Sequence, residues 1–122
     1  MITVITPYPP TVNHYYGNRP KGGKYIKPPG IAYRAATHQY VNRYKLVAPD
    51  GRLQVAIEVF PPDRRKRDLD NVGKACLDAL QHAGVYADDC LIDDLRFTRM
   101  QVVKDGMLRI FISQYKVENE KA

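Results

Sequence analysis

Alternating apolar and polar residues identify the strands of this chain. Every second residue from 53 to 59 is Leu, Val or Ile, which is typical of a strand with one buried face. Similar patterns predict short strands at 2–6 and 107–113 and a further strand at 91–103. Residues 104–106, Lys-Asp-Gly, are predicted to join the last two strands as a hairpin.

Two other segments repeat their apolar residues with the period of a helix. One covers 31–47, and the other runs from about Leu69 or Asp70 to Ala83, before Gly84, a residue that suits a helix C-terminus. The two apolar stripes are Tyr33, Ala36, Tyr40, Tyr44 and Val47, and Leu69, Val72, Cys76, Ala79 and Ala83. We interpret the tyrosine stripe as core, with a base-stacking platform as the alternative.

The resulting order is strand, helix, strand, helix, strand, strand. It predicts an α+β fold in which two helices cover one face of a small mixed four-stranded sheet. Because there is no repeat and no internal boundary, residues 1–122 are predicted to form a single domain. The charged tail after Gln114 is expected to fray.

Charge is distributed very unevenly along this chain of net charge +6. Up to Pro49 there are seven Lys or Arg residues and no acidic residue, and all 13 carboxylates lie at Asp50 or beyond. An N-terminal part whose charged side chains are all positive indicates a polyanionic partner, and nucleic acid is the partner that fits best. No apolar run approaches the ~20 residues of a membrane span, and no signal peptide is evident, so a cytoplasmic protein without a membrane partner is expected.

The two cysteines, Cys76 and Cys90, do not have the spacing of a zinc site. They are interpreted as small semi-buried side chains in a reducing compartment.

Residues 11–30 combine Gly, Pro, Tyr and Lys without periodicity, which predicts a long loop. Lys21, Lys24 and Lys27 are candidates for phosphate contacts, with nearby tyrosines offering rings for stacking. The alternative is a solvated loop whose tyrosines pack on the body of the protein.

The strongest candidate site begins where four cations, Arg64 to Arg67, precede Asp68 and Asp70. Extended backbone would turn both carboxylates to one side, and Lys74 lies one helical turn after Asp70. Asp88 and Asp89 follow the helix and could return beside this pair. Hard oxygen ligands without sulfur or imidazole favour Mg²⁺, with Mn²⁺ as a possible substitute. The alternative is a solvated helix end capped by one aspartate.

Several motifs together resemble the RusA family of Holliday-junction endonucleases. The central one is Asp63-Arg64-Arg65-Lys66-Arg67-Asp68-Leu69-Asp70-Asn71, followed by Lys74-Ala75, Asp78-Ala79-Leu80, Ala83-Gly84 and Asp88-Asp89. Pro9-Pro10-Thr11, Asn13, Tyr16 and Ala32-Tyr33-Arg34 also fit that family.

The resemblance implies a homodimeric, Mg²⁺-dependent resolvase of bacterial or bacteriophage origin, acting on four-way junction DNA in recombination and repair. The family's catalytic and metal-binding acids fall on Asp68, Asp70 and Asp89, and its catalytic lysine falls on Lys74. The run Arg64, Arg65, Lys66 and Arg67 is assigned to DNA binding. Two alternatives stay open: a protein that grips branched DNA without cutting it, and a metal nuclease acting on forks or flaps.

Overall fold

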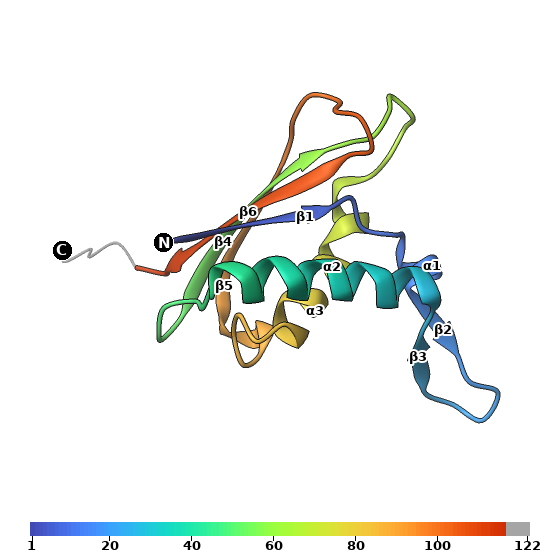
Figure 1. Cartoon of the computed structure of the whole chain (residues 1–122), viewed down its shortest axis with the longest axis horizontal. Helices are drawn as coiled ribbons and strands as arrows, with labels where there is room; N and C mark the ends of the chain where they lie inside the picture. Colours follow the sequence, from blue (N-terminus) through green and yellow to red (C-terminus); the bar gives the residue numbers. More distant parts are fainter. Residues whose placement is uncertain (117–122) are drawn as a thin grey trace.

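Four strands form the central sheet in the order β1-β6-β4-β5. They are β1 (Ile2–Pro7), β4 (Leu53–Phe60), β5 (Ile92–Arg99) and β6 (Met107–Gln114). Strand β6 is antiparallel to both β1 and β4, whereas β5 is parallel to β4, so the sheet is mixed. The computed structural model describes residues 1–116, and most of the tail expected to fray lies outside these residues (Figure 1).

The expected hairpin between the last two strands is wrong, because β5 and β6 lie on opposite sides of β4. The apolar residues of β6, Leu108, Ile110 and Ile112, are fully buried, as suits a strand with a neighbour on each side. Strand β5 is more exposed and forms one edge of the sheet, opposite β1. Residues 103–106 still turn tightly, with positive φ at Asp105 and Gly106.

The two main helices, α2 (Pro28–Tyr44) and α3 (Gly73–His82), pack against each other on one side of the sheet (Figure 1). They share one core with the strands, formed by buried residues that include Val4, Val41, Val55, Ile57, Cys76, Leu80, Leu108, Ile110 and Ile112. The predicted α+β class and the order of its main elements are therefore confirmed.

Helix α2 begins and ends three residues earlier than predicted, with Pro28 and Pro29 in its first turn. Its buried stripe is Gly30, Tyr33, Thr37 and Val41, whereas Tyr44 and Val47 are exposed. Thr37 can be fully buried because its hydroxyl donates to the Tyr33 carbonyl, 2.9 Å away. Hydrophobic patterning does not detect a polar residue satisfied in this way.

The segment predicted as a loop contains a short helix and a hairpin. They are α1 (Val12–Tyr15), β2 (Tyr16–Asn18) and β3 (Lys24–Ile26). Gly22 and Gly23 supply the positive φ angles of the turn. The β2–β3 hairpin extends away from the sheet (Figure 1), and we call it the arm.

A second, smaller core attaches the arm to the helices. Tyr15, Tyr33, Ala75 and Ala79 are buried there, with Tyr16 and Ile26 packed against them. A Cβ atom on Gly30 would lie only 2.8 Å from the Tyr15 carbonyl oxygen, so α2 can approach α1 this closely only through a glycine. No helix within residues 1–116 is long and apolar enough to cross a bilayer.

Candidate active site

Asp68 and Asp70 lie where the chain enters helix α3 through the 3₁₀ turn η1 (Leu69–Val72). Asp68 precedes the turn in an extended conformation and Asp70 lies within it, so the expectation of extended backbone holds only for Asp68. Asp68 occupies the cap position, but its side chain makes no capping hydrogen bond. Both residues are exposed, and within residues 1–116 neither carboxylate has a hydrogen-bond or ion-pair partner.

Lys74 lies in the first turn of α3 with its ammonium over an aromatic ring. Its Nζ is 5.3 Å from the centroid of the Tyr16 ring in the arm. The preceding residue, Gly73, is buried, and a Cβ atom there would lie 2.9 Å from the Phe97 ring of β5. Within the described residues Lys74 has no carboxylate partner, so its charge remains available.

The second acidic pair lies against the C-terminal half of α3. The 3₁₀ turn η2 (Asp89–Leu91) begins at Asp89, whose backbone N–H donates to the Gln81 side chain of α3 over 3.1 Å. Burial, followed by the charge of Asp78 and in part that of Asp89, raises the pKa of Tyr16 to about 12.

Asp88 and Asp89 have different surroundings. The Asp88 carboxylate accepts the backbone N–H of Cys90 at 2.9 Å, and this hydrogen bond lowers the pKa of Asp88. The Asp89 carboxylate has no hydrogen-bond or ion-pair partner within residues 1–116. Asp89 is thus the member of the pair that can bind another group while every existing hydrogen bond stays in place.

Asp68, Asp70 and Asp89 offer the hard oxygen donors that suit Mg²⁺. Their carboxylates have no competing partners among the described residues, which fits a role as ligands. However, no three His, Cys, Asp or Glu side chains within residues 1–116 are grouped closely enough to hold a metal ion. A shared ion would require their side chains to converge.

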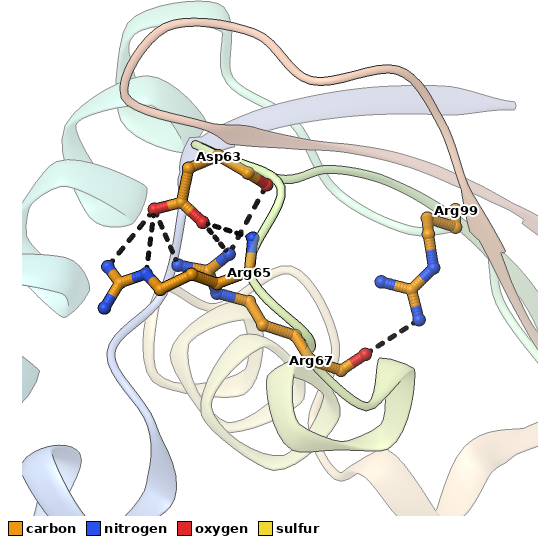
Figure 2. A network of polar contacts seen from close by, with 4 residues as sticks. All are labelled: Asp63, Arg65, Arg67 and Arg99. Carbon is orange, nitrogen blue, oxygen red and sulfur yellow. Dashed lines mark hydrogen bonds and ion pairs between the residues drawn. The ribbon is translucent and has the colours of Figure 1, made fainter.

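The basic run is organised around Asp63 (Figure 2). The Asp63 carboxylate accepts from Arg67 at 2.5 Å and from the side chain and backbone N–H of Arg65. These contacts, with the Arg67 hydrogen bond the largest, hold the pKa of Asp63 far below its ordinary value. Arg99 at the end of β5 donates to the Arg67 carbonyl at 2.8 Å.

The four cations of this run therefore have two kinds of role. Arg65 and Arg67 pair with Asp63, and Arg67 also lies over the Tyr8 ring. Arg64 and Lys66 are exposed and form no ion pair within residues 1–116. The sequence did not reveal that Asp63 and Arg99 hold this loop in place. Residue spacing does not show which charged side chains bond to each other and which face solvent.

The three lysines predicted to contact phosphates in this region also differ in their surroundings. Lys21 is exposed near the tip, and Lys24 is exposed with its Nζ 5.8 Å from the Tyr16 ring centroid. Lys27 precedes α2 and donates to the Asn13 carbonyl at 2.9 Å. Lys21 and Lys24 are thus the better placed to meet a ligand.

Comparison with known proteins identifies the family of this chain. A family described as "Endodeoxyribonuclease RusA" matches residues 7–113, which include the arm, the basic run and every candidate catalytic residue. The chain belongs to the RusA family of endodeoxyribonucleases. It is therefore a nuclease, and the predicted resemblance is confirmed.

Relatives in this family come from bacteria and from bacteriophages. A "Crossover junction endodeoxyribonuclease RusA" of Shigella sonnei (strain Ss046) is 36% identical over 113 residues, covering 92% of this chain and 93% of the relative. The protein of that name from Escherichia coli (strain K12) is 35% identical with the same coverage. The one from Enterobacteria phage HK97 is 39% identical, covering 90% of this chain and 92% of the relative.

Cys76 and Cys90 are both free thiols, but only Cys76 is buried, whereas Cys90 is exposed beside Asp89. The expectation of two semi-buried thiols is therefore wrong. The reason is that Cys90 lies in the η2 turn, outside the helix-sheet core that encloses Cys76.

Proposed function

We propose that this RusA-family nuclease resolves four-way DNA junctions by paired nicks, with Mg²⁺ as cofactor and as a homodimer. The observation that carries the proposal is a set of three carboxylates without partners in residues 1–116, Asp68, Asp70 and Asp89, distributed around the helix that presents Lys74. Crossover-junction activity in the names of relatives similar over nine tenths of the chain supports the choice of substrate.

In this proposal Asp68, Asp70 and Asp89 hold the metal ion. Bound Mg²⁺ would lower the pKa of a water molecule and neutralise charge that develops on the scissile phosphate. Mn²⁺, another hard cation, would be the expected substitute. Carboxylates beside a polyanion repel it, so three of them without partners among the described residues favour a cutting enzyme over a protein that only binds DNA.

Lys74 would stabilise the negative charge that develops on the phosphate oxygens in the transition state. Its ammonium has no carboxylate partner within the described residues and rests on the Tyr16 ring, which limits its motion without neutralising it.

Two basic surfaces flank this site and would bind the DNA backbone. One is the run from Arg64 to Arg67, in which Arg64 and Lys66 meet phosphates while Arg65 and Arg67 hold the loop in shape. The other is the arm, with Lys21 and Lys24 exposed and Lys27 at its base. Phosphate contacts of this kind supply affinity without base specificity.

Resolving a four-way junction requires two cuts, one in each of two DNA strands related by an approximate two-fold axis. A homodimer would place two identical sites accordingly, since a two-fold interface repeats each site on both subunits. The proposed setting is DNA recombination and repair in the cytoplasm of a bacterium, with the gene carried by the bacterium or by a phage.

The test is a comparison of labelled substrates: a four-way junction, a fork, a flap and a linear duplex, each with Mg²⁺ or EDTA. We expect paired nicks in the junction only with Mg²⁺ and little cutting of the duplex. Faster cutting of the fork or flap would show that one of these, and not the junction, is the substrate. Binding without cutting under all conditions would support a protein that binds branched DNA without cleaving it.

A further inference from the structure

Lys74 and Asp78 lie one helical turn apart on α3 but do not pair. Opposite charges four residues apart commonly form ion pairs on a helix. Within residues 1–116 Asp78 forms an ion pair only with Arg34, and Lys74 forms none. The Asp78 carboxylate is bonded to side chains of other helices instead.

Arg34 and Tyr15 hold that carboxylate through one of its oxygens, Oδ2. Arg34 Nη2 donates to Asp78 Oδ2 at 2.5 Å and its Nε donates at 3.1 Å, while the Tyr15 hydroxyl donates at 2.8 Å. Arg34 Nε also donates to the Tyr15 hydroxyl at 2.8 Å, so the three side chains form a closed network. They come from α1, α2 and α3, which are packed together here by the second core.

The network is partly shielded from water, which strengthens it. The side chains of Arg34 and Asp78 are 23% and 33% exposed, and Tyr15 is fully buried. Charge-assisted hydrogen bonds of this kind are stronger than those between neutral groups. A flexible lysine, which is well solvated, is a weak competitor for a carboxylate that already accepts three such bonds.

Lys74 makes a cation–π contact with Tyr16, which holds the ammonium without neutralising its charge. The Tyr16 ring packs against Tyr15, with ring centroids 4.4 Å apart, and Lys74 Nζ lies 5.3 Å from the Tyr16 centroid. A cation over a neutral tyrosine ring is attracted to the ring without being neutralised. Tyr15 and Tyr16 therefore couple the Asp78 network to the position of Lys74.

We infer that Arg34, assisted by Tyr15, is a positioning residue: it occupies Asp78 so that Lys74 stays unpaired and available to a DNA phosphate. This inference rests on the proposed function, since it assigns Arg34 a role in the same reaction. Without Arg34, the Asp78 carboxylate would turn to Lys74 and neutralise it.

The test measures single-turnover junction cleavage with Mg²⁺ for the wild type and for the variants Arg34→Met, Asp78→Asn and Arg34→Met/Asp78→Asn. We expect Arg34→Met to lower the rate by about 10–100-fold, in the range of substitutions that act through another residue. Asp78→Asn alone should stay within about threefold of wild type. The double variant should recover to the rate of Asp78→Asn, because no carboxylate is left to capture Lys74.

Recovery in the double variant separates this role from a purely structural one. If Arg34 only stabilised the fold, removing Asp78 as well would give a rate as low as that of Arg34→Met or lower, and that result would overturn the inference. A wild-type rate for Arg34→Met would overturn it too. Tyr15→Phe, which removes one hydroxyl, should slow cleavage by a few fold in the wild-type background and not in the Asp78→Asn background, so the inference stays testable if Arg34→Met does not fold.

Two controls keep this test distinct from that of the proposed function. If the wild type fails to cut the junction, the proposed function is wrong. If the wild type cuts and Lys74→Ala is slow, but Arg34→Met is not, then only the role of Arg34 is wrong.

Discussion

Asp63 and Asp68 are five residues apart and differ in whether their carboxylates have hydrogen-bond partners. Asp63 accepts hydrogen bonds from two arginines and from a backbone N–H, whereas the Asp68 carboxylate has no partner within residues 1–116. A paired carboxylate stabilises the fold, and one without a partner can bind a ligand while the existing hydrogen bonds stay intact. This difference leads to a test based on pH.

We expect Asp63→Asn to lower the midpoint of thermal unfolding more at pH 7 than at low pH. The pKa of Asp63 is depressed in the folded protein relative to its ordinary value of 3.8. Its contribution to stability is therefore fully present above about pH 4 and disappears as the pH falls toward the lowered value. Thermal scans of wild type and variant between about pH 7 and pH 2 should show a difference in midpoint that narrows on acidification.

Asp68→Asn is the matched control for that series, because it removes a carboxylate that has no partner among the described residues. Its midpoint should differ little from wild type across the same range. A gap for Asp63→Asn that is constant with pH, or absent at pH 7, would show that the ion pairs around Asp63 contribute nothing to folding.

Spacing made Asp68, Asp70 and Lys74 candidates, with a capped helix end as the alternative, and the family resemblance pointed to Asp89 in preference to Asp88. Spacing could not reveal that Asp78 belongs to the same region, because its partners Arg34 and Tyr15 are 44 and 63 residues away in the chain. Contacts at such separation depend on how α1, α2 and α3 pack, which single-sequence patterns do not specify.

At the scale of elements, the basic loop before η1 divides its cations between structure and ligand. Arg64 and Lys66 are exposed and without ion pairs in residues 1–116, whereas Arg67 is held by Asp63 and by the Tyr8 ring. Substitutions in the same loop should therefore have different consequences.

We expect the double variant Arg64→Ala/Lys66→Ala to bind all DNA shapes more weakly and with less dependence on salt. For each phosphate that the variant no longer neutralises, the log–log salt slope should fall by about 0.9. The measurement is the junction dissociation constant in EDTA over a range of roughly 50 to 300 mM salt. Arg43→Ala, an exposed cation at the other end of α2 from the arm, should leave the slope unchanged (Figure 1). Equal slopes for the double variant and the wild type would show that this run faces solvent when DNA is bound.

Strongly periodic elements were predictable, and the arm was not. Strand β4 was predicted almost to the residue because its alternation reflects one buried face. Strands β2 and β3 have three residues each and pair only with each other among the described residues, so no period could develop. The order of the strands in the sheet could not be predicted from the sequence either. Hydrophobic patterning indicates that one face of β6 is buried, but it does not indicate which strands lie beside β6.

At the scale of the whole molecule, quaternary structure is the part of the proposed function that goes furthest beyond one chain. Both main helices lie on one side of the sheet, and β1 and β5 leave two strand edges without a partner strand among the described residues. Such edges are places where a second chain can add.

We expect sedimentation of the free protein at micromolar concentration to give a dimer of the 13.9 kDa chain. One dimer should then place both nicks in a junction before it dissociates. A clean monomer in solution would contradict this form of the proposal, and assembly on the junction would then be the remaining route to paired cutting.

The central claim is that the carboxylates around α3 serve cleavage and not binding. Asp70→Asn tests it most directly, because the substitution removes a candidate ligand, keeps the shape of the side chain and breaks no side-chain hydrogen bond or ion pair within residues 1–116. Cleavage and binding of one labelled four-way junction should be measured for wild type and variant side by side, the first with Mg²⁺ and the second with EDTA. We predict that cleavage is abolished while the dissociation constant is unchanged or lower, since a charge that repels phosphate is gone. Cleavage by the folded variant at the wild-type rate would contradict the account.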